Sequence, residues 1–232
     1  LLPETAVGGI PGLRYVPPGF AGDSNSSTVL FTSQRDVLGG YTVREGFVDA
    51  LRARRVPADV HLVDAHLGYF ERGLLLERLM ADVVDPLRAG GIRDLWFVGI
   101  SLGGFAALAA ALHRRADITG TLAIAPYVGR PALMQQIRAA GNVPAWRATQ
   151  RDAADGEAAR WIELADASPG RRAGLHLYSA RADRFAEDQR LFASLLPEAN
   201  VQWVDGDHDW PAWRSLWALW LERAPWPTGP LA

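Results

Sequence analysis

Apolar residues along the chain form short continuous runs, and between these runs they recur every three or four positions. Short runs rich in β-branched and aromatic residues are typical of buried strands, and the wider spacing is typical of helices that bury one face. The predicted strands lie at 28–32, 59–63, 94–99, 118–125, 175–179 and 201–204. The predicted helices lie at 43–51, 76–83, 103–114, 186–196 and 210–220. This alternation indicates parallel βαβ units, so we expect an α/β fold with a mostly parallel sheet of about six strands and helices on both faces.

The N-terminal residues and one proline depart from this alternation. Residues 1–27 are rich in proline, glycine and serine, which predicts largely irregular structure with one short strand at 13–16. Pro86 follows the helical spacing of 76–83, and a proline there should stop or kink the helix. The chain has no internal repeat and its 232 residues suit one domain, so 1–232 is predicted to be a single domain.

The segment 127–172 has no strand signal and is too long for an ordinary connection between two strands. Its apolar residues are scattered among charges, and they include Trp146 and Trp161. We therefore expect a small helical cap over the strand ends, in which these tryptophans close an acyl pocket.

The stretch Gly99-Ile-Ser-Leu-Gly-Gly104 joins a predicted buried strand to a predicted helix. A serine between small residues at such a sharp turn presents its hydroxyl away from the sheet, and glycines at 99 and 103 avoid a collision of Cβ atoms. The start of the helix also directs unpaired N–H groups toward whatever binds beside Ser101, which favours negative charge. The pattern predicts that Ser101 is a nucleophile, against the alternative of an ordinary turn serine.

A serine hydroxyl needs a base that takes its proton as it attacks. Of the five histidines, His61 and His176 lie within predicted strands, and His113 lies near the end of a predicted helix. His208 follows the last strand, in a loop that leads into the C-terminal helix. Loops after parallel strands share one edge of the sheet, so His208 is the predicted base.

The third group must accept a hydrogen bond from the other ring nitrogen of His208. The neighbouring Asp205, Asp207 and Asp209 are too close in sequence to face that nitrogen easily. Asp183 comes just after the strand at 175–179, and the order serine, aspartate, histidine is that of α/β-hydrolases. The alternative is that Asp183 only caps the following helix, in which case Glu187 or Asp188 is the acid.

An oxyanion hole requires two backbone N–H groups. Leu102 supplies one by its position after the serine, and the loop after the strand at 28–32 should supply the other, from Ser33 or Gln34.

Composition limits the chemistry and the partners. The net charge is −2 and no basic face is present, so nucleic acid is not an expected partner. The chain contains no cysteine, which excludes disulfides, thiolate metal ligands and cysteine nucleophiles. All 24 basic residues are arginine, which removes lysine as a base. No apolar run approaches the roughly 20 residues that span a bilayer, so no transmembrane span is expected in this chain.

Three further patterns resemble binding sites, but none of the three predicts one. Asp205-Gly-Asp-His-Asp209 resembles the start of a calcium loop, but tryptophan stands where that loop needs glycine and glutamate. Asp64 with His66 could be half of a metal site, although a lone pair near a strand end is more often structural. The tryptophans between 210 and 220 share one helix face, which favours packing against the sheet over carbohydrate stacking. No metal site is therefore predicted.

From about residue 28 to its C-terminus the chain resembles the α/β-hydrolase superfamily. His208-Asp-Trp-Pro-Ala-Trp213 is similar to the end of esterases related to esterase D and the mycolyltransferases. Asp64-Ala-His-Leu-Gly-Tyr-Phe70, together with the serine turn, is similar to a group of small proteobacterial hydrolases. The chain departs from the superfamily in its short N-terminal part and in the loop that should complete the oxyanion hole.

The resemblance implies cleavage of a small or medium acyl ester or thioester through an acyl-serine, with Ser101, Asp183 and His208 as the triad and without a cofactor. An acyltransferase that uses an alcohol in place of water, and a binding protein that has kept the fold, are the two alternatives. The chain begins Leu1-Leu-Pro3 without a methionine, which fits a removed export signal or a shortened chain. A bacterial cytoplasmic location, export after signal removal and the oligomeric state all stay open.

Overall fold

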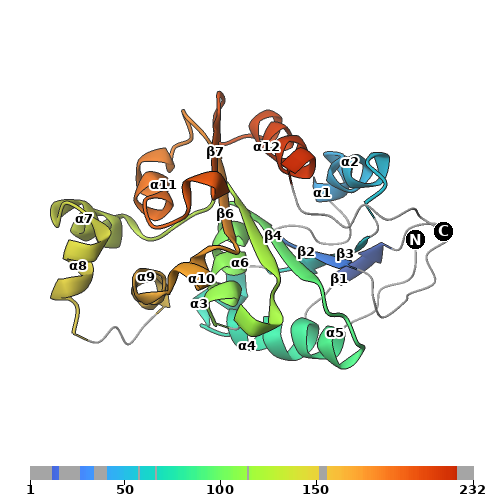
Figure 1. Cartoon of the computed structure of the whole chain (residues 1–232), viewed down its shortest axis with the longest axis horizontal. Coiled ribbons are helices and arrows are strands. Elements are labelled where there is room, and N and C mark those ends of the chain that lie inside the picture. Colours follow the sequence, from blue (N-terminus) through green and yellow to red (C-terminus); the bar gives the residue numbers. More distant parts are fainter. Residues whose placement is uncertain are drawn as a thin grey trace.

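The structure is a computed structural model, and Figure 1 shows its overall arrangement. It describes residues 12–15, 27–33, 41–56, 58–65, 67–113, 115–151 and 156–223, of which 12–15, 27–33 and Arg115 are described as backbone alone.

Seven strands form one sheet in the order β1-β3-β2-β4-β5-β6-β7. They are β1 (Gly12–Tyr15), β2 (Ser27–Ser33), β3 (Ala58–Asp64), β4 (Leu95–Ile100), β5 (Gly120–Ile124), β6 (Leu175–Ala180) and β7 (Val201–Val204). All neighbouring strands are parallel except β1, which pairs antiparallel with β3 at the edge. The predicted α/β class is confirmed, and the short N-terminal strand becomes the seventh member of the sheet. Residues 1–11 and 16–26 lie outside the described residues, so irregular structure there stays a prediction.

Helices cover both faces of the sheet, as Figure 1 shows for α2 and α12 on one side and α4, α6 and α9 on the other. The α-helices are α1 (Tyr41–Arg44), α2 (Phe47–Ala53), α3 (Leu67–Glu71), α4 (Leu75–Leu79), α5 (Asp85–Ala89), α6 (Leu102–His113), α7 (Pro131–Ala139), α8 (Val143–Thr149), α9 (Gly156–Asp166), α10 (Pro169–Arg172), α11 (Ala186–Ala193) and α12 (Trp210–Arg223). A π-helix, η1 (Met80–Val84), and two 3₁₀ turns, η2 (Arg115–Asp117) and η3 (Glu198–Asn200), complete the described elements.

The two faces of the central strand β4 belong to two separate apolar cores. Leu95 and Phe97 pack with the α6 side, whereas Trp96, Val98 and Ile100 pack with the α2 and α12 side. All five side chains are buried, because helices cover the strand on both faces. This is why parallel strands of this sheet read as continuous apolar runs and not as an alternation of apolar and polar residues.

Pro86 does not stop the helical path, contrary to one of the two outcomes expected from the sequence. The chain runs from α4 through η1 into α5, where Pro86 occupies the first turn. In η1 the N–H of Asp85 bonds to the carbonyl of Met80, five residues back. Proline is tolerated in the first turn of a helix, where its missing N–H has no intrahelical acceptor, so the wider π turn lets a new helix start without a break.

The C-terminal tryptophans divide between the core and the sheet edge. Trp217 and Trp220 are almost fully buried, and the indole N–H of Trp217 donates to the carbonyl of Phe47 over 2.9 Å. Trp220 packs edge-on against Trp96 of β4, with ring centroids 5.5 Å apart. The predicted packing of this helix against the sheet therefore holds for its second half, while Trp210 and Trp213 are only partly buried.

A histidine inside β6 makes stability depend on pH. The ring of His176 lies 6.2 Å from that of Trp96, and burial lowers the pKa of His176 to about 4. In the unfolded chain its pKa is near 6.5, so between these values the unfolded state binds a proton that the folded state does not. The contribution of His176 to stability is complete above pH 6.5 and is lost as the pH falls toward 4, by up to about 3 kcal/mol.

We therefore expect His176→Gln to lose less free energy of unfolding between pH 7.5 and pH 4.5 than the unaltered protein loses. Urea unfolding at both pH values measures this difference. His113→Gln, at the exposed end of α6, is the matched control and should keep the full loss. An equal loss in the two variants would contradict the assignment to His176.

Candidate active site

The turn between β4 and α6 holds Ser101 in a left-handed backbone conformation, with φ of 55°. Its N–H donates to the carbonyl of Ile124 over 3.0 Å, and its carbonyl accepts from the N–H of Tyr127 over 3.0 Å. A Cβ on residue 99 would lie 2.1 Å from the carbonyl oxygen of Gly103, so glycine is required there. The structure adds a second close approach at Gly104. The requirement for glycine at 103 stays a prediction.

Gly104 begins the tightly packed face of α6 against the loop that follows β5. A Cβ there would lie 2.9 Å from the Cβ of Pro126. Because Pro126 precedes the residue whose N–H bonds to Ser101, Gly104 allows that loop to pack against the serine turn, while Gly99 allows α6 to do so.

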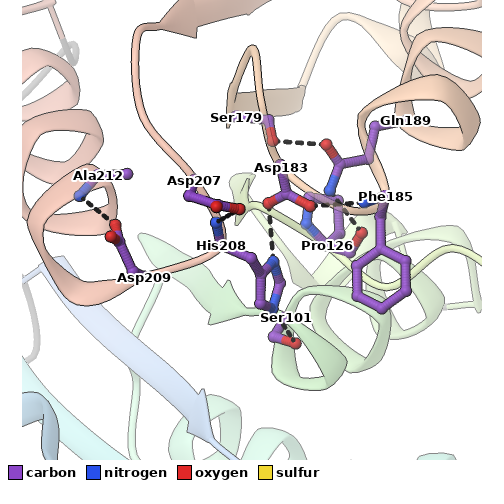
Figure 2. Close-up of polar contacts among 10 residues, drawn as sticks. All are labelled: Ser101, Pro126, Ser179, Asp183, Phe185, Gln189, Asp207, His208, Asp209 and Ala212. Atoms are coloured by element: carbon purple, nitrogen blue, oxygen red, sulfur yellow. Dashed lines mark hydrogen bonds and ion pairs between the residues drawn. The ribbon is translucent and has the colours of Figure 1, made fainter.

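His208 lies in the loop after β7, and none of its three neighbouring aspartates faces its ring. Asp207 accepts the backbone N–H of His208 over 2.7 Å, and Asp209 accepts the N–H of Ala212 over 3.0 Å, which caps α12. Asp205 is exposed. Figure 2 shows Asp209 directed away from the imidazole, toward Ala212, and the Asp207 carboxylate against the backbone N–H of His208.

The structure brings Ser101, Asp183 and His208 together (Figure 2). His208 Nδ1 lies 2.7 Å from Asp183 Oδ2, and His208 Nε2 lies 3.1 Å from Ser101 Oγ. The Asp183 side chain is fully buried and 8% of the His208 side chain is exposed. The other carboxylate oxygen of Asp183 accepts the N–H of Phe185 over 2.8 Å, so Asp183 also orders the turn before α11.

The two alternative acids lie elsewhere. Glu187 is exposed, and Asp188 forms an ion pair with Arg138. Burial raises the pKa of Asp188, and the charge of Arg138 opposes that rise. Neither carboxylate contacts the ring of His208 in the described contacts.

Two aromatic rings hold the imidazole. The sequence reasoning gave Phe185 no role and assigned Trp213 to packing against the sheet. Phe185 and Trp213 both meet the His208 ring edge-on, with centroids 5.2 and 5.0 Å away at interplanar angles of 90° and 88°. The signal was present, since Phe185 follows Asp183 closely and Trp213 belongs to the motif that begins at His208. Such perpendicular contacts restrict rotation of the ring and keep its two nitrogens aligned with their partners.

A second unpredicted residue, Gln189 of α11, lies beneath the site with no exposed surface. Its Oε1 accepts the hydroxyl of Ser179 over 2.5 Å, and its Nε2 donates to the carbonyl of Pro126 over 3.0 Å (Figure 2). Gln189 thus ties the end of β6 to the loop that supports the serine turn. A lone glutamine on a helix carries no sequence signal for this role.

The predicted oxyanion groups are described only in part. Leu102 is the first residue of α6, so its N–H has no acceptor within the helix. Ser33 ends β2, whose residue Thr32 is in register with Gly99 of β4, so the backbone at 33 lies at the same sheet edge as the serine turn. Gln34 lies outside the described residues.

A cavity of about 580 Å³ opens beside Ser101 and Leu102. Its apolar wall includes Leu67, Phe70, Leu75, Leu76, Phe105 and Phe185. Its polar wall consists of Ser101, Tyr127, Glu157, Arg160 and Arg184. This size is typical of small-molecule sites, which usually measure about 300 to 1,000 Å³.

The cavity wall differs from the one expected from the sequence. Trp146 and Trp161 do not border the space beside Ser101, because both are buried in the apolar core on the α6 side. The indole N–H of Trp161 donates to the carbonyl of Val128 over 2.7 Å. From the segment 127–172, the residues that border the cavity are Tyr127 and three positions in the first half of α9.

Neither a metal cluster nor a membrane-spanning helix is found within the described residues. No group of three or more histidine, aspartate or glutamate side chains there could hold a metal ion. Asp64 ends β3 and is buried, while His66 lies outside the described residues, so the pairing of the two stays untested. In the same part of the chain, no helix is long and apolar enough to cross a bilayer.

Comparison with known proteins rests on structure, since no protein-family model and no curated protein matches the chain. The chain is similar to FphF, a fluorophosphonate-binding serine hydrolase of Staphylococcus aureus, with 14% identity and a TM-score of 0.60 over 91% of this chain and 96% of that one. It is similar to an S-formylglutathione hydrolase of Agrobacterium tumefaciens, with 17% identity and a TM-score of 0.59 over 92% and 88%.

A third similar structure is MGS-MChE2, an α/β-hydrolase enzyme from a lagoon-sediment metagenome. Its identity is 16% and its TM-score is 0.58, over 93% of this chain and 96% of that one. At such low identities the likeness shows the fold alone. The chain therefore has the α/β-hydrolase fold.

Proposed function

We propose that this protein is a serine hydrolase that cleaves a small or medium acyl ester or thioester through an acyl-serine intermediate. The observation that carries the proposal is the continuous contact from Asp183 through His208 to Ser101, at 2.7 and 3.1 Å. These distances are within reach of proton transfer between a nucleophile, its base and an orienting acid. The serine hydrolases and esterases among the similar structures support the same reaction class.

In this mechanism the Asp183 carboxylate accepts a hydrogen bond from the Nδ1–H of His208, which leaves the lone pair of Nε2 free to take the proton of the Ser101 hydroxyl. Oγ forms a bond to the carbonyl carbon as that proton moves to Nε2, and the carbonyl electrons move to oxygen. The imidazolium then donates its proton to the departing alcohol or thiol, and the acyl group stays on Ser101. Water then attacks the acyl carbon as His208 Nε2 takes its proton, and the imidazolium returns this proton to Ser101 Oγ as the bond between Oγ and the acyl carbon breaks and the acid is released. The proposed reaction requires no cofactor.

The developing oxyanion accepts a hydrogen bond from the N–H of Leu102 in this proposal, and the positive end of α6 adds to its stabilisation. The second donor is the backbone after β2, at Ser33 or Gln34. We also propose that the chain is one domain, in which 127–172 forms a partial cap that contributes one helix, α9, to the cavity wall.

The two alternative functions are an acyltransferase, which uses the same three residues, and a binding protein. In an acyltransferase an alcohol replaces water in the second step, and the products of a reaction run with added alcohol distinguish it. A binding protein of this fold would not need the contacts between acid, histidine and serine, so their presence favours an enzyme. The end motif from His208 to Trp213 adds a resemblance to esterases related to esterase D.

Ser101→Ala should abolish both ester hydrolysis and labelling by a fluorophosphonate, because only the attacking oxygen is removed. We expect kcat to fall by about 10⁴ or more, as in other triads. Rates with p-nitrophenyl butyrate and gel fluorescence after labelling measure the two effects. Thr149→Ala, on α8, is the control and should retain both activities. Undiminished turnover in Ser101→Ala would overturn the proposed function.

Asp183→Asn should keep the fold but lower kcat by about 10⁴, because an amide favours the wrong tautomer of His208. Glu187→Gln and Asp188→Asn are the matched controls, and each should remain within about threefold of the unaltered rate. If one of these controls loses activity while Asp183→Asn does not, the acid has been assigned to the wrong residue.

Short acyl chains should be cleaved faster than long ones, because the cavity is bordered by the charged groups of Arg160 and Arg184. A long chain would place its methylenes against these guanidinium groups and remove water from them without a hydrogen bond in return. We expect kcat/KM for p-nitrophenyl acetate and butyrate to exceed that for palmitate. A preference for palmitate would show that Arg160 and Arg184 do not limit the length of the acyl chain.

A further inference from the structure

Three charged side chains, Glu157, Arg160 and Arg184, border the cavity beside Ser101. The negative one is already neutralised. Glu157 accepts the hydroxyl of Tyr127 over 2.8 Å and the backbone N–H of Arg130 over 2.8 Å, and it forms an ion pair with the guanidinium of Arg130 at 3.1 Å. Its carboxylate therefore adds little net negative charge to the cavity.

Arg160 has a donor that the described residues leave unused. Its Nη2 pairs with Glu163 at 2.8 Å, one helical turn further along α9. Its Nη1 is buried and has no hydrogen-bond partner among the described residues. A buried N–H group of this kind is costly, and native proteins satisfy nearly all of them, with protein, water or a ligand.

Arg184 forms no ion pair with any carboxylate in the part of the chain that is described. Its guanidinium carbon lies 4.8 Å from the ring centroid of Phe185, the residue that also packs against His208. This stacking holds Arg184 on the ring that packs against the proposed catalytic histidine, at the border of the cavity. The charge of Arg184 is thus positioned by an aromatic ring and not neutralised by an acid.

We propose that the cavity binds a substrate carrying an anionic group, a carboxylate or a phosphate, remote from the ester or thioester that Ser101 attacks. This inference rests on the proposed function and adds the substrate class to it. Guanidinium groups hold such anions through paired, charge-assisted hydrogen bonds. The positive end of α9 also borders the cavity at Gly156 and favours the same charge. Apolar side chains make up most of the remaining wall and suit a hydrocarbon spacer.

The anion could belong to the acyl chain or to the leaving group, and matched ester pairs distinguish the two. For the acyl chain, mono-p-nitrophenyl adipate is compared with p-nitrophenyl hexanoate, which has the same length without the carboxylate. For the leaving group, 4-carboxyphenyl butyrate is compared with 4-carbamoylphenyl butyrate. We expect kcat/KM to favour the anionic member of one pair by about tenfold or more, after subtraction of the rate without enzyme.

Arg160→Gln and Arg184→Gln should each lower that anionic-to-neutral ratio by about tenfold. Glu163→Gln is the control for Arg160, because it breaks the same ion pair but keeps the guanidinium. Arg190→Gln is the control for Arg184, because Arg190 stacks on Trp203 at 5.2 Å in the same way but does not border the cavity. Arg190→Gln should keep the ratio of the unaltered protein, and Glu163→Gln should keep or raise it, because the guanidinium of Arg160 stays and loses only its carboxylate partner.

The outcomes separate this inference from the proposed function. Hydrolysis of the neutral esters without preference for either anionic partner, or a ratio that the two arginine variants leave unchanged, overturns the inference and leaves the hydrolase intact. Absence of both hydrolysis and fluorophosphonate labelling of Ser101 overturns the function itself. If Ser101 is labelled but none of the four esters is cleaved, the inference is tested by measuring how well an added anion slows labelling of Ser101 by the fluorophosphonate. Adipate should slow labelling more than adipamide does, and equal effects overturn the inference.

Discussion

The site depends on one backbone conformation, the left-handed turn at Ser101. A non-glycine residue in this region costs about 1 to 3 kcal/mol and persists only where its surroundings enforce it. Here the N–H of Ser101 is held by the end of β5 and its carbonyl by the residue after Pro126, while Gly99 allows the chain to pass within contact of α6. The sheet and helix therefore hold the serine from both sides, and its hydroxyl meets His208 without rearrangement.

The acid and the histidine reach this serine because two loops are bonded to each other. The N–H of Arg181 donates to the carbonyl of Val204, and that of Ala182 donates to the carbonyl of Gly206. These bonds extend the pairing of β6 with β7 past the strand ends, so Asp183 and His208 approach although 25 residues separate them. Phe185 and Trp213 then fix the imidazole ring, and Gln189 ties the same region to the loop below Ser101.

The residues of the cavity wall come from different elements than the three proposed catalytic residues. The three proposed catalytic residues lie just after strands of the sheet. The cavity, in contrast, receives side chains from α3, α4, α6 and α9 and from the loops after β5 and β6. Substitutions on α9 can therefore alter the charge of the cavity without moving Ser101. This separation agrees with the proposal that Arg160 and Arg184 determine substrate selectivity while Ser101, Asp183 and His208 carry out the reaction.

The sequence alone determined the alternation of strands and helices, because parallel strands buried on both faces must be continuous apolar runs. It also determined the serine turn, because small residues on both sides of Ser101, between a strand and a helix, are typical of that turn. The order of Ser101, Asp183 and His208 along the sheet edge followed from their positions after three of the predicted strands. Only the tertiary structure revealed how the helical path continues through Pro86 and how Phe185 and Trp213 pack against the His208 ring. It also revealed the role of Gln189 and the burial of Trp146 and Trp161. The contacts of Phe185, Gln189 and Trp161 join segments distant in the chain, and a local pattern of apolar spacing does not specify which segment a side chain will face.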